Sequence, residues 1–202
     1  FHPRPRNDAL RTTLGIGPQE IVLCYHGNMH PANRVEIRSL YLAVALLNRQ
    51  GCPARLVRMG TDHVVHEPEY LRWAAEFTIQ LGYVVDRRHV VDVLAMADVF
   101  VQPGTSDAFN DYRIPSKVPE FFALGRPVIL PKANIGHVTR HMQDAFVLDE
   151  ANGQNICAAI RTICSNPATS HALAEGAWLF SERNFRWDRS AAHVAGLYEA
   201  LD

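Results

Sequence analysis

Residues Ile21–Asn28 read IVLCYHGN and indicate the class of fold to which this 202-residue chain belongs. Five apolar residues followed by His-Gly-Asn are typical of a buried parallel strand that ends in a turn. An amphipathic helix is predicted next, because apolar residues recur at helical spacing: Ile37, Leu40, Tyr41, Val44 and Leu47. Gly51 ends this helix, and Ala54–Met59 is predicted to be the next strand.

Strands and helices continue to alternate along the rest of the chain. The predicted strands are 83–85, 99–102, 128–130 and 146–148, and the predicted helices are 68–81, 87–97, 116–125, 152–164, 169–184 and 188–201. This alternation predicts an α/β fold, a Rossmann-like parallel sheet with helices on both faces. We expect residues 1–17 to be a linker or irregular lead-in and residues 18–202 to form one domain.

Three loops follow predicted strands and are candidates for ligand binding. Ligands of open parallel sheets bind beyond the carboxyl ends of the strands. This rule selects residues 26–33, 103–117 and 131–137.

The composition excludes several classes of protein. A net charge of -1 gives no basic footprint for nucleic acid, and no apolar run reaches the length of a membrane-spanning helix. The four cysteines form no C-x-x-C pair, so we expect them to be buried structural residues of a protein in the reducing cytoplasm.

Several motifs carry a resemblance to a known family. The most specific is PEFFALGRPVI at residues 119–129, and LAMADVFVQP at residues 94–103 precedes it. The closing segment contains Phe185-Arg186-Trp187 and Leu197-Tyr198. In this order and spacing, the chain from Ile21 to its end resembles the C-terminal domain of family 4-type retaining glycosyltransferases (glycosyl transferases group 1), which is half of a GT-B fold.

The resemblance implies a donor-binding domain that holds a UDP- or GDP-linked sugar as substrate, with no tightly bound cofactor and no metal. The sugar would pass to a hydroxyl acceptor with retention of configuration. The acceptor would sit mainly on an N-terminal domain of the same chain, and the start at Phe1 fits its absence from this sequence. Peripheral contact with the inner face of a membrane would also go through that domain.

The resemblance places Glu120 at the family glutamate that accepts hydrogen bonds from the ribose hydroxyls; a simple helix N-terminal charge is the alternative. Two departures stand out. The cations that follow the first strand in the family are replaced by Asn28 and Asn33, and a second glutamate is replaced by Tyr112. Either Asp107 or Asp111 substitutes for that glutamate, or both are acidic residues of a solvated loop.

Arg113 and Lys117 offer compensating positive charge, since a helix N-terminus with a nearby lysine suits a phosphate group. A surface pair between Lys117 and Glu120 is the alternative. The nucleobase is expected near residues 82–84, and Gly136 either approaches the donor or makes a plain turn. The predicted donor-binding set is Gly27, Asn28, Asn33, Val84, Arg113, Ser116, Lys117, Glu120, Ile135 and Gly136. We predict no catalytic base.

Other readings remain beside this one. A nicotinamide-binding domain needs G-x-G-x-x-G after a strand, whereas Gly15-Ile16-Gly17 precedes the first one. A degenerate, non-catalytic domain used for binding or assembly is the stronger alternative, given Asn28 and Asn33. The last helix carries an apolar stripe that packs on this domain's own sheet, on the absent domain or on a second copy, which would give a dimer.

Overall fold

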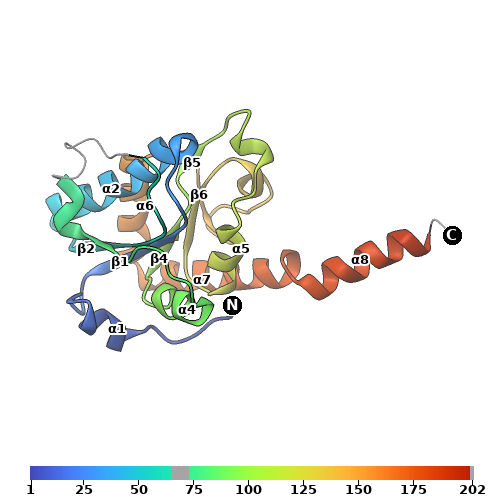
Figure 1. Cartoon of the computed structure of the whole chain (residues 1–202), viewed down its shortest axis with the longest axis horizontal. Coiled ribbons are helices and arrows are strands. Elements are labelled where there is room, and N and C mark those ends of the chain that lie inside the picture. Colours follow the sequence, from blue (N-terminus) through green and yellow to red (C-terminus); the bar gives the residue numbers. More distant parts are fainter. Residues whose placement is uncertain (65–72, 201–202) are drawn as a thin grey trace.

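A parallel sheet forms the centre of the computed structural model, which describes residues 1–64 and 73–200 (Figure 1). Within these residues the six-stranded sheet has the order β3-β2-β1-β4-β6-β7, and every neighbouring pair is parallel. Its strands are β1 (Ile21–His26), β2 (Ala54–Met59), β3 (Thr78–Gln80), β4 (Val99–Val101), β6 (Val128–Pro131) and β7 (Phe146–Leu148). The order is that of a Rossmann sheet, which confirms the predicted fold class.

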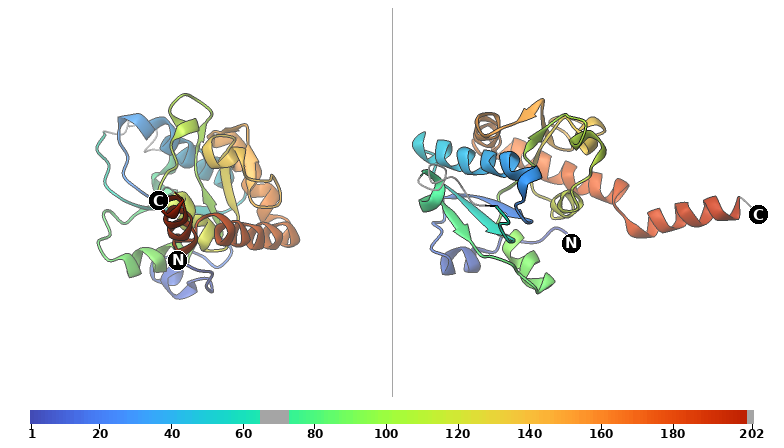
Figure 2. Two further views of the ribbon diagram at one scale, coloured as in Figure 1. Left: turned by 90° about the vertical axis from the view of Figure 1, so that its right-hand side faces the viewer. Right: turned by 45° about the horizontal axis from the view of Figure 1, so that its top comes forward.

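The sheet separates two hydrophobic clusters, and helices lie on both of its faces (Figure 2). Leu23 and Tyr25 of β1 face a cluster with α2 (Arg34–Arg49) and α6 (Gly153–Cys164). Val22 and Cys24 point the other way, towards helices α4 (Arg87–Leu94), α5 (Lys117–Ala123) and α7 (Pro167–Asn184). Side chains alternate between the faces of a strand, so a strand buried on both faces is apolar at nearly every position.

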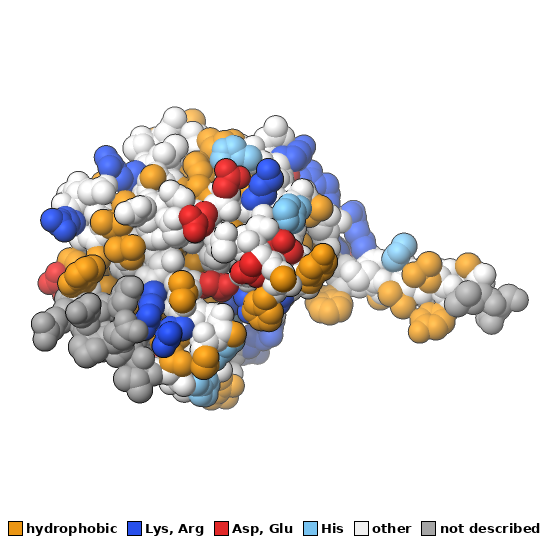
Figure 3. All heavy atoms as spheres, turned by 90° about the horizontal axis from the view of Figure 1, so that it is seen from above, with side chains coloured by type: hydrophobic (Ala, Val, Ile, Leu, Met, Phe, Trp, Pro, Cys, Tyr) orange, Lys and Arg blue, Asp and Glu red, His pale blue; other side chains and the backbone are white. Residues whose placement is uncertain are grey.

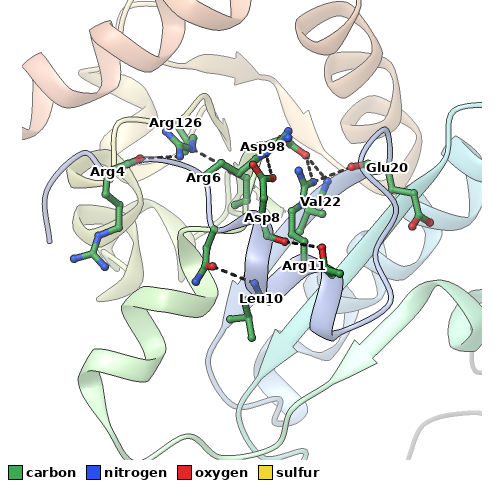
Figure 4. Close-up of polar contacts among 12 residues, drawn as sticks. Arg4, Arg6, Asp8, Leu10, Arg11, Glu20, Val22, Asp98 and Arg126 are labelled. Atoms are coloured by element: carbon green, nitrogen blue, oxygen red, sulfur yellow. Dashed lines mark hydrogen bonds and ion pairs between the residues drawn. The ribbon is translucent and has the colours of Figure 1, made fainter.

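The lead-in predicted to be irregular contains a helix, α1 (Asp8–Thr13), so that prediction is wrong for these residues. The helix is held by a buried charge: Arg11 is only 2% exposed, and its guanidinium donates to Asp98 at 2.6 Å and to the Glu20 carbonyl at 2.8 Å (Figure 4). These partners come from other segments, which local sequence cannot reveal. A domain start at residue 18 stays a prediction.

One edge of the sheet also differs from expectation. The helix predicted over 68–81 lies partly outside the described residues; its described end contains a short 3-10 turn, η2 (Ala75–Phe77), and strand β3. The strand predicted at 83–85 is not one. Thr78 and Ile79 are β-branched residues, which favour strands. Because β3 also pairs with the edge of β2, these residues form a strand in spite of the helical pattern in the sequence.

The final helix, α8 (Trp187–Glu199), projects away from the rest of the molecule (Figure 1). None of its residues is buried within the described chain, and Trp187 is 88% exposed. Figure 3 shows its apolar side chains in the open. Packing of this stripe on the domain's own sheet is therefore excluded. Among the described residues, no helix is long and apolar enough to cross a membrane.

Candidate functional site

The candidate site lies where the chain leaves β1 and β4 in opposite directions. From β1 the chain passes to α2 on one face, and from β4 it passes through a long loop to α5 on the other. Such a switch point leaves a crevice beyond the carboxyl ends of the two strands. The three predicted ligand loops follow β1, β4 and β6, which are parallel, so they gather at this edge of the sheet.

Glu120, in the first turn of α5, is held by two side chains from other elements. Its Oε2 atom lies 2.8 Å from Nε2 of His26, the last residue of β1. Its Oε1 atom accepts a hydrogen bond of 3.1 Å from Arg87, at the start of α4. The carboxylate therefore sits at the junction of three elements, and the alternative pair with Lys117 is not formed among the described residues.

Lys117 begins α5 and turns its ammonium group into the crevice. Nζ lies 4.7 Å from the centre of the Tyr25 ring, and a Cβ atom on Gly27 would come within 3.0 Å of Lys117 Cε. Within residues 1–64 and 73–200, Nζ makes no hydrogen bond or ion pair. Burial, helped by the positive charge of Arg113, lowers the pKa of Lys117 to about 8. Glu36 and Glu120 favour the ammonium form through space but form no ion pair with it among the described residues, so the group can still receive an anion.

Arg113 is tied to the opposite wall of the crevice. Its guanidinium lies 3.5 Å from a Glu36 carboxylate oxygen and donates to Asn110 at 3.1 Å. Asn110 in turn donates to Glu36 at 2.9 Å, so the loop after β4 is fastened to the first turn of α2. Arg113 therefore has an ion-pair partner in Glu36, whereas Lys117 feels Glu36 and Glu120 only through space and forms no ion pair among the described residues.

Asn28 and Asn33 build the loop after β1 rather than presenting their side chains freely. The side-chain oxygen of Asn28 accepts from the Thr61 backbone at 2.9 Å. Asn33, which is buried, donates to the Asn28 carbonyl at 3.0 Å and accepts from the His30 backbone at 2.9 Å. Both amides are thus engaged with the backbone of neighbouring turns.

A buried guanidinium lies beneath the same loop. Arg58 of β2 donates to Tyr41 at 2.6 Å and to Asp62 at 2.9 Å, and it reaches the Gly27 carbonyl at 3.5 Å. The sequence analysis did not identify Arg58, although an arginine near the end of a buried strand was an available signal, since a buried charge needs partners.

Glycines bring the turns after β1 and β2 into backbone contact. Gly27 and Gly60 have φ values of +133° and +124°, which favour glycine. A Cβ on Gly60 would lie 2.4 Å from the Gly27 carbonyl oxygen. Gly60 also donates to the Gly82 carbonyl at 2.7 Å, and Val84 packs on the core. The residues expected near a nucleobase therefore lie beside the turn that contacts Lys117.

Gly136 and Ile135 occupy a short helix, η4 (Asn134–His137), after β6. Both residues are buried, and a Cβ on Gly136 would come within 2.0 Å of the Pro131 carbonyl oxygen. Gly136 is thus required for close packing on the end of β6. Asn134 donates to the Asn110 carbonyl at 2.8 Å, which joins this helix to the loop after β4.

Asp107 and Asp111 are loop-forming acids, and Tyr112 is 91% exposed. Hydrogen bonds from the backbone amides of Asn110 and Phe109 hold the pKa of Asp107 below its ordinary value. Asp111 accepts from the Ser106 hydroxyl at 2.9 Å. The loop after β4 is therefore ordered by its own polar side chains.

A cavity of about 530 Å³ lies beside Glu120, along the outer side of α5. Ser116, exposed at the start of α5, lines it together with Arg87, Trp178 and Trp187. Another cavity of about 530 Å³, lined by Ile21, Cys52 and Cys164, lies at the beginning of β1 and so at the other end of the sheet. Of these two cavities, the first adjoins the candidate site and the second does not.

Metal binding finds no support in the part of the chain that the structure describes. No group of three or more His, Cys, Asp or Glu side chains is arranged there to hold an ion. The four cysteines are free thiols, two buried and two partly buried.

The sequence profile of glycosyl transferases group 1 matches residues 20–166. The chain belongs to this family. The match covers the sheet, all three ligand loops and α6. It confirms the resemblance that the PEFFALGRPVI motif indicates.

Two relatives show how much of a longer protein the chain represents. It is 25% identical to a D-inositol 3-phosphate glycosyltransferase of Rhodococcus opacus, over 95% of this chain and 43% of that protein. It is 28% identical to a GDP-mannose-dependent alpha-(1-6)-phosphatidylinositol dimannoside mannosyltransferase of Mycobacterium tuberculosis, over 100% and 49%. The chain spans less than half the length of these relatives.

Solved structures confirm the fold. Anabaena HepE in complex with UDP superposes with a TM-score of 0.76 at 17% identity, over 96% of this chain and 52% of that one. The C-terminal domain of the group 1 glycosyl transferase LpcC of Francisella tularensis gives 0.70 at 12% identity, over 93% and 96%. The chain therefore has the fold of one half of a GT-B glycosyltransferase.

Proposed function

We propose that the chain is the donor-binding domain of a glycosyltransferase that moves a sugar from a nucleotide diphosphate to a hydroxyl acceptor with retention. The observation that carries this proposal is the largely buried ammonium of Lys117 in the crevice between the loops after β1 and β4. Family membership supports the reaction class, and the UDP present in the HepE structure supports the class of donor.

Each part of the donor meets suitable chemistry at this edge of the sheet. Glu120 would accept hydrogen bonds from the ribose hydroxyls, and the turns around Gly27, Gly60 and Gly82 would approach the base. Lys117 and the start of α5 would face the diphosphate. As the glycosidic bond breaks, negative charge grows on the diphosphate, and a preorganised cation stabilises that charge more than it stabilises the ground state.

Arg113, Asn28 and the remaining predicted residues take supporting roles in this proposal. Arg113 adds positive charge from the loop after β4, while Asn28 and Asn33 keep the loop after β1 in shape. Ile135 and Gly136 hold the loop after β6 against the sheet. The leaving diphosphate itself would take the acceptor proton in a front-face displacement, so we assign no catalytic base.

We further propose that an acceptor-binding domain completes the enzyme, on the cytoplasmic side of a membrane. The relatives are about twice as long as this chain, which supports a second domain. The apolar residues Trp187, Leu197 and Tyr198 of α8 find no partner among the described residues, so they are suited to contact that domain or a second copy.

Calorimetry with UDP, GDP and their free nucleosides tests the role of Lys117. Charge reversal, Lys117→Glu, should weaken nucleoside diphosphate binding at least about tenfold more than nucleoside binding, because only the diphosphate carries the charge that Lys117 contacts. Arg49→Glu, at an exposed arginine at the end of α2 and outside the three ligand loops, is the control. Equal losses for nucleoside and nucleoside diphosphate would contradict the assignment.

The same titration addresses the alternative of a degenerate domain. Because preferential binding to the native state raises its stability, a cognate nucleotide should also raise the melting temperature. If the wild-type chain binds neither UDP nor GDP at millimolar concentration, a non-catalytic binding or assembly role replaces the donor-binding proposal.

A further inference from the structure

His26 is the last residue of β1, and its ring orientation is fixed by aromatic packing. The ring meets Phe121 edge-on, with centroids 5.7 Å apart and planes at 78°. Phe121 is itself stacked on Phe100 of β4 at 4.5 Å. Since these phenylalanines are fully buried in the core, the position of the imidazole is set by the sheet rather than by a mobile loop.

The imidazole points at the carboxylate that we assign to the ribose. Nε2 of His26 and Oε2 of Glu120 lie 2.8 Å apart, and both atoms are shielded from water. Nε2 carries a hydrogen in this arrangement, because its lone pair would repel a carboxylate oxygen at that distance. The contact is thus an attraction between an N–H group and a carboxylate, and it is stronger in this partly buried setting than at the surface.

Neither atom completes an aligned hydrogen bond with any residue that the structure describes. Oε2 is held against the imidazole and shielded, so the accessible part of the carboxylate lies on the side of Oε1, where a ligand hydroxyl can reach it. The other oxygen, Oε1, accepts from Arg87, whose side chain is 76% exposed. Exposed charge pairs contribute little, so Arg87 constrains the carboxylate less than the packed imidazole does.

We propose that His26 is a positioning residue that orients the carboxylate of Glu120 towards the two hydroxyl groups of a ribose. The inference rests on the proposed function, and it assigns to His26 the selection of ribonucleotides over nucleotides without those hydroxyls. Oε1 can accept protons from those hydroxyls only while the carboxylate keeps this orientation. Loss of the imidazole frees its rotation and removes that preorganisation.

The test compares a nucleoside diphosphate with its 2′,3′-dideoxy analogue by calorimetry, using whichever of UDP and GDP the wild-type chain binds more tightly. We expect the wild type to favour the ribonucleotide about tenfold to a hundredfold, as hydrogen bonds to a charged group require. His26→Phe keeps a ring beside Phe121 but should reduce this preference to less than about threefold. Glu120→Gln should reduce it as well.

His26→Gln restores an N–H group near the position of Nε2 and should recover most of the preference. His89→Phe, at an exposed histidine of α4, is the matched control and should behave as the wild type. A full preference in His26→Phe, with Glu120→Gln impaired, overturns the role of His26 and leaves the proposed function intact. A wild type that binds neither nucleotide instead overturns the proposed function, and this inference falls with it.

Discussion

Among the residues of the site, Lys117 combines burial with positive charge in a way that makes its ligand affinity depend on pH. Its pKa of about 8 lies below the ordinary value for lysine, first because of burial and then because of Arg113. Water no longer solvates the ammonium fully, and the more distant carboxylates of Glu36 and Glu120 offset only part of that loss. A bound diphosphate would stabilise the ammonium further. Above pH 8, binding would therefore be coupled to the uptake of a proton by the amine of Lys117.

We therefore predict that nucleoside diphosphate affinity declines as pH rises from 7.5 to 9.5. Lys117 is mainly in its ammonium form below its pKa of about 8. Above that value, the fraction in the ammonium form falls by up to about tenfold for each unit of pH. Calorimetry across this range measures the decline. Lys117→Arg keeps its charge throughout and should give a flatter profile; an identical decline in that variant would argue against titration of Lys117.

Asp98 is a second residue whose charge carries a large share of local stability. One oxygen, Oδ2, accepts from Arg11 at 2.6 Å and from the Val22 backbone at 2.7 Å, as Figure 4 shows. Asp98→Asn leaves the buried guanidinium of Arg11 without its counterion. We expect urea unfolding to show a loss of about 3 to 5 kcal/mol, as for other broken buried pairs.

Arg6 provides the control for this prediction. Its guanidinium also faces Asp98, at 3.4 Å, but its side chain is 39% exposed. Arg6→Gln should lower the free energy of unfolding by less than about 1 kcal/mol. Similar losses for Asp98→Asn and Arg6→Gln would mean that burial of Arg11 is not the source of the effect.

The sequence singled out candidate residues of the site but not their partners. Glu120 was proposed from a motif and Lys117 from its place at the start of a helix. The contacts of His26 with Glu120, of Glu36 with Arg113 and of Arg11 with Asp98 join residues between 77 and 94 positions apart. No local pattern encodes such pairs, since they arise only when the sheet brings the strands together.

At the level of helices and strands, two helical glycines differ in whether their surroundings leave room for a side chain. Gly176 of α7 lies against the turn before β7, where a Cβ atom would come within 1.7 Å of the Gln143 carbonyl oxygen. Gly196 of α8 has no atom within 4 Å of the same position. Gly176 allows α7 to pack directly against the backbone of Gln143. Gly196 makes no such contact and only lowers the helix propensity of α8.

Gly176→Ala should therefore destabilise the protein by about 1 to 3 kcal/mol or more, because α7 must move away from the Gln143 backbone. Gly196→Ala should cause no loss and should raise helicity slightly, since alanine is the better helix former by up to about 1 kcal/mol. Thermal unfolding followed by circular dichroism measures both. A tolerated Gly176→Ala would show that this helix contact is loose.

Elements with a strong apolar pattern were predicted to within a few residues. Strand β2 matches its predicted bounds, and α2 extends the predicted helical face by a turn. Strand β3 was missed because three residues with mixed burial carry little periodicity, and their strand geometry depends on pairing with β2. Short edge strands of this kind are decided by their neighbours rather than by their own sequence.

For the whole molecule, we expect the projecting helix α8 to contribute to self-association but little to the stability of the fold. Because none of its residues is buried, removal of the chain after Arg186 should change the melting temperature by less than about 2 °C. The complete chain should self-associate with rising concentration through the exposed face of Trp187, Leu197 and Tyr198, and the truncated chain should not. Sedimentation velocity separates the two; a truncated chain that still associates would place the contact elsewhere.

The loop after β4 has one further consequence for the molecule. Its first residues form strand β5 (Gly104–Thr105), which pairs antiparallel with β8 (Glu150–Ala151) just before α6. Together with the hydrogen bonds that join Asn110 to Glu36 and Asn134, this fastens the loop at its start and at its middle. The loop consequently loses its conformational entropy when the chain folds, and ligand binding does not have to order it again. The loop acts as a fixed template, and selectivity then depends on the shape it already has rather than on closure around what it binds.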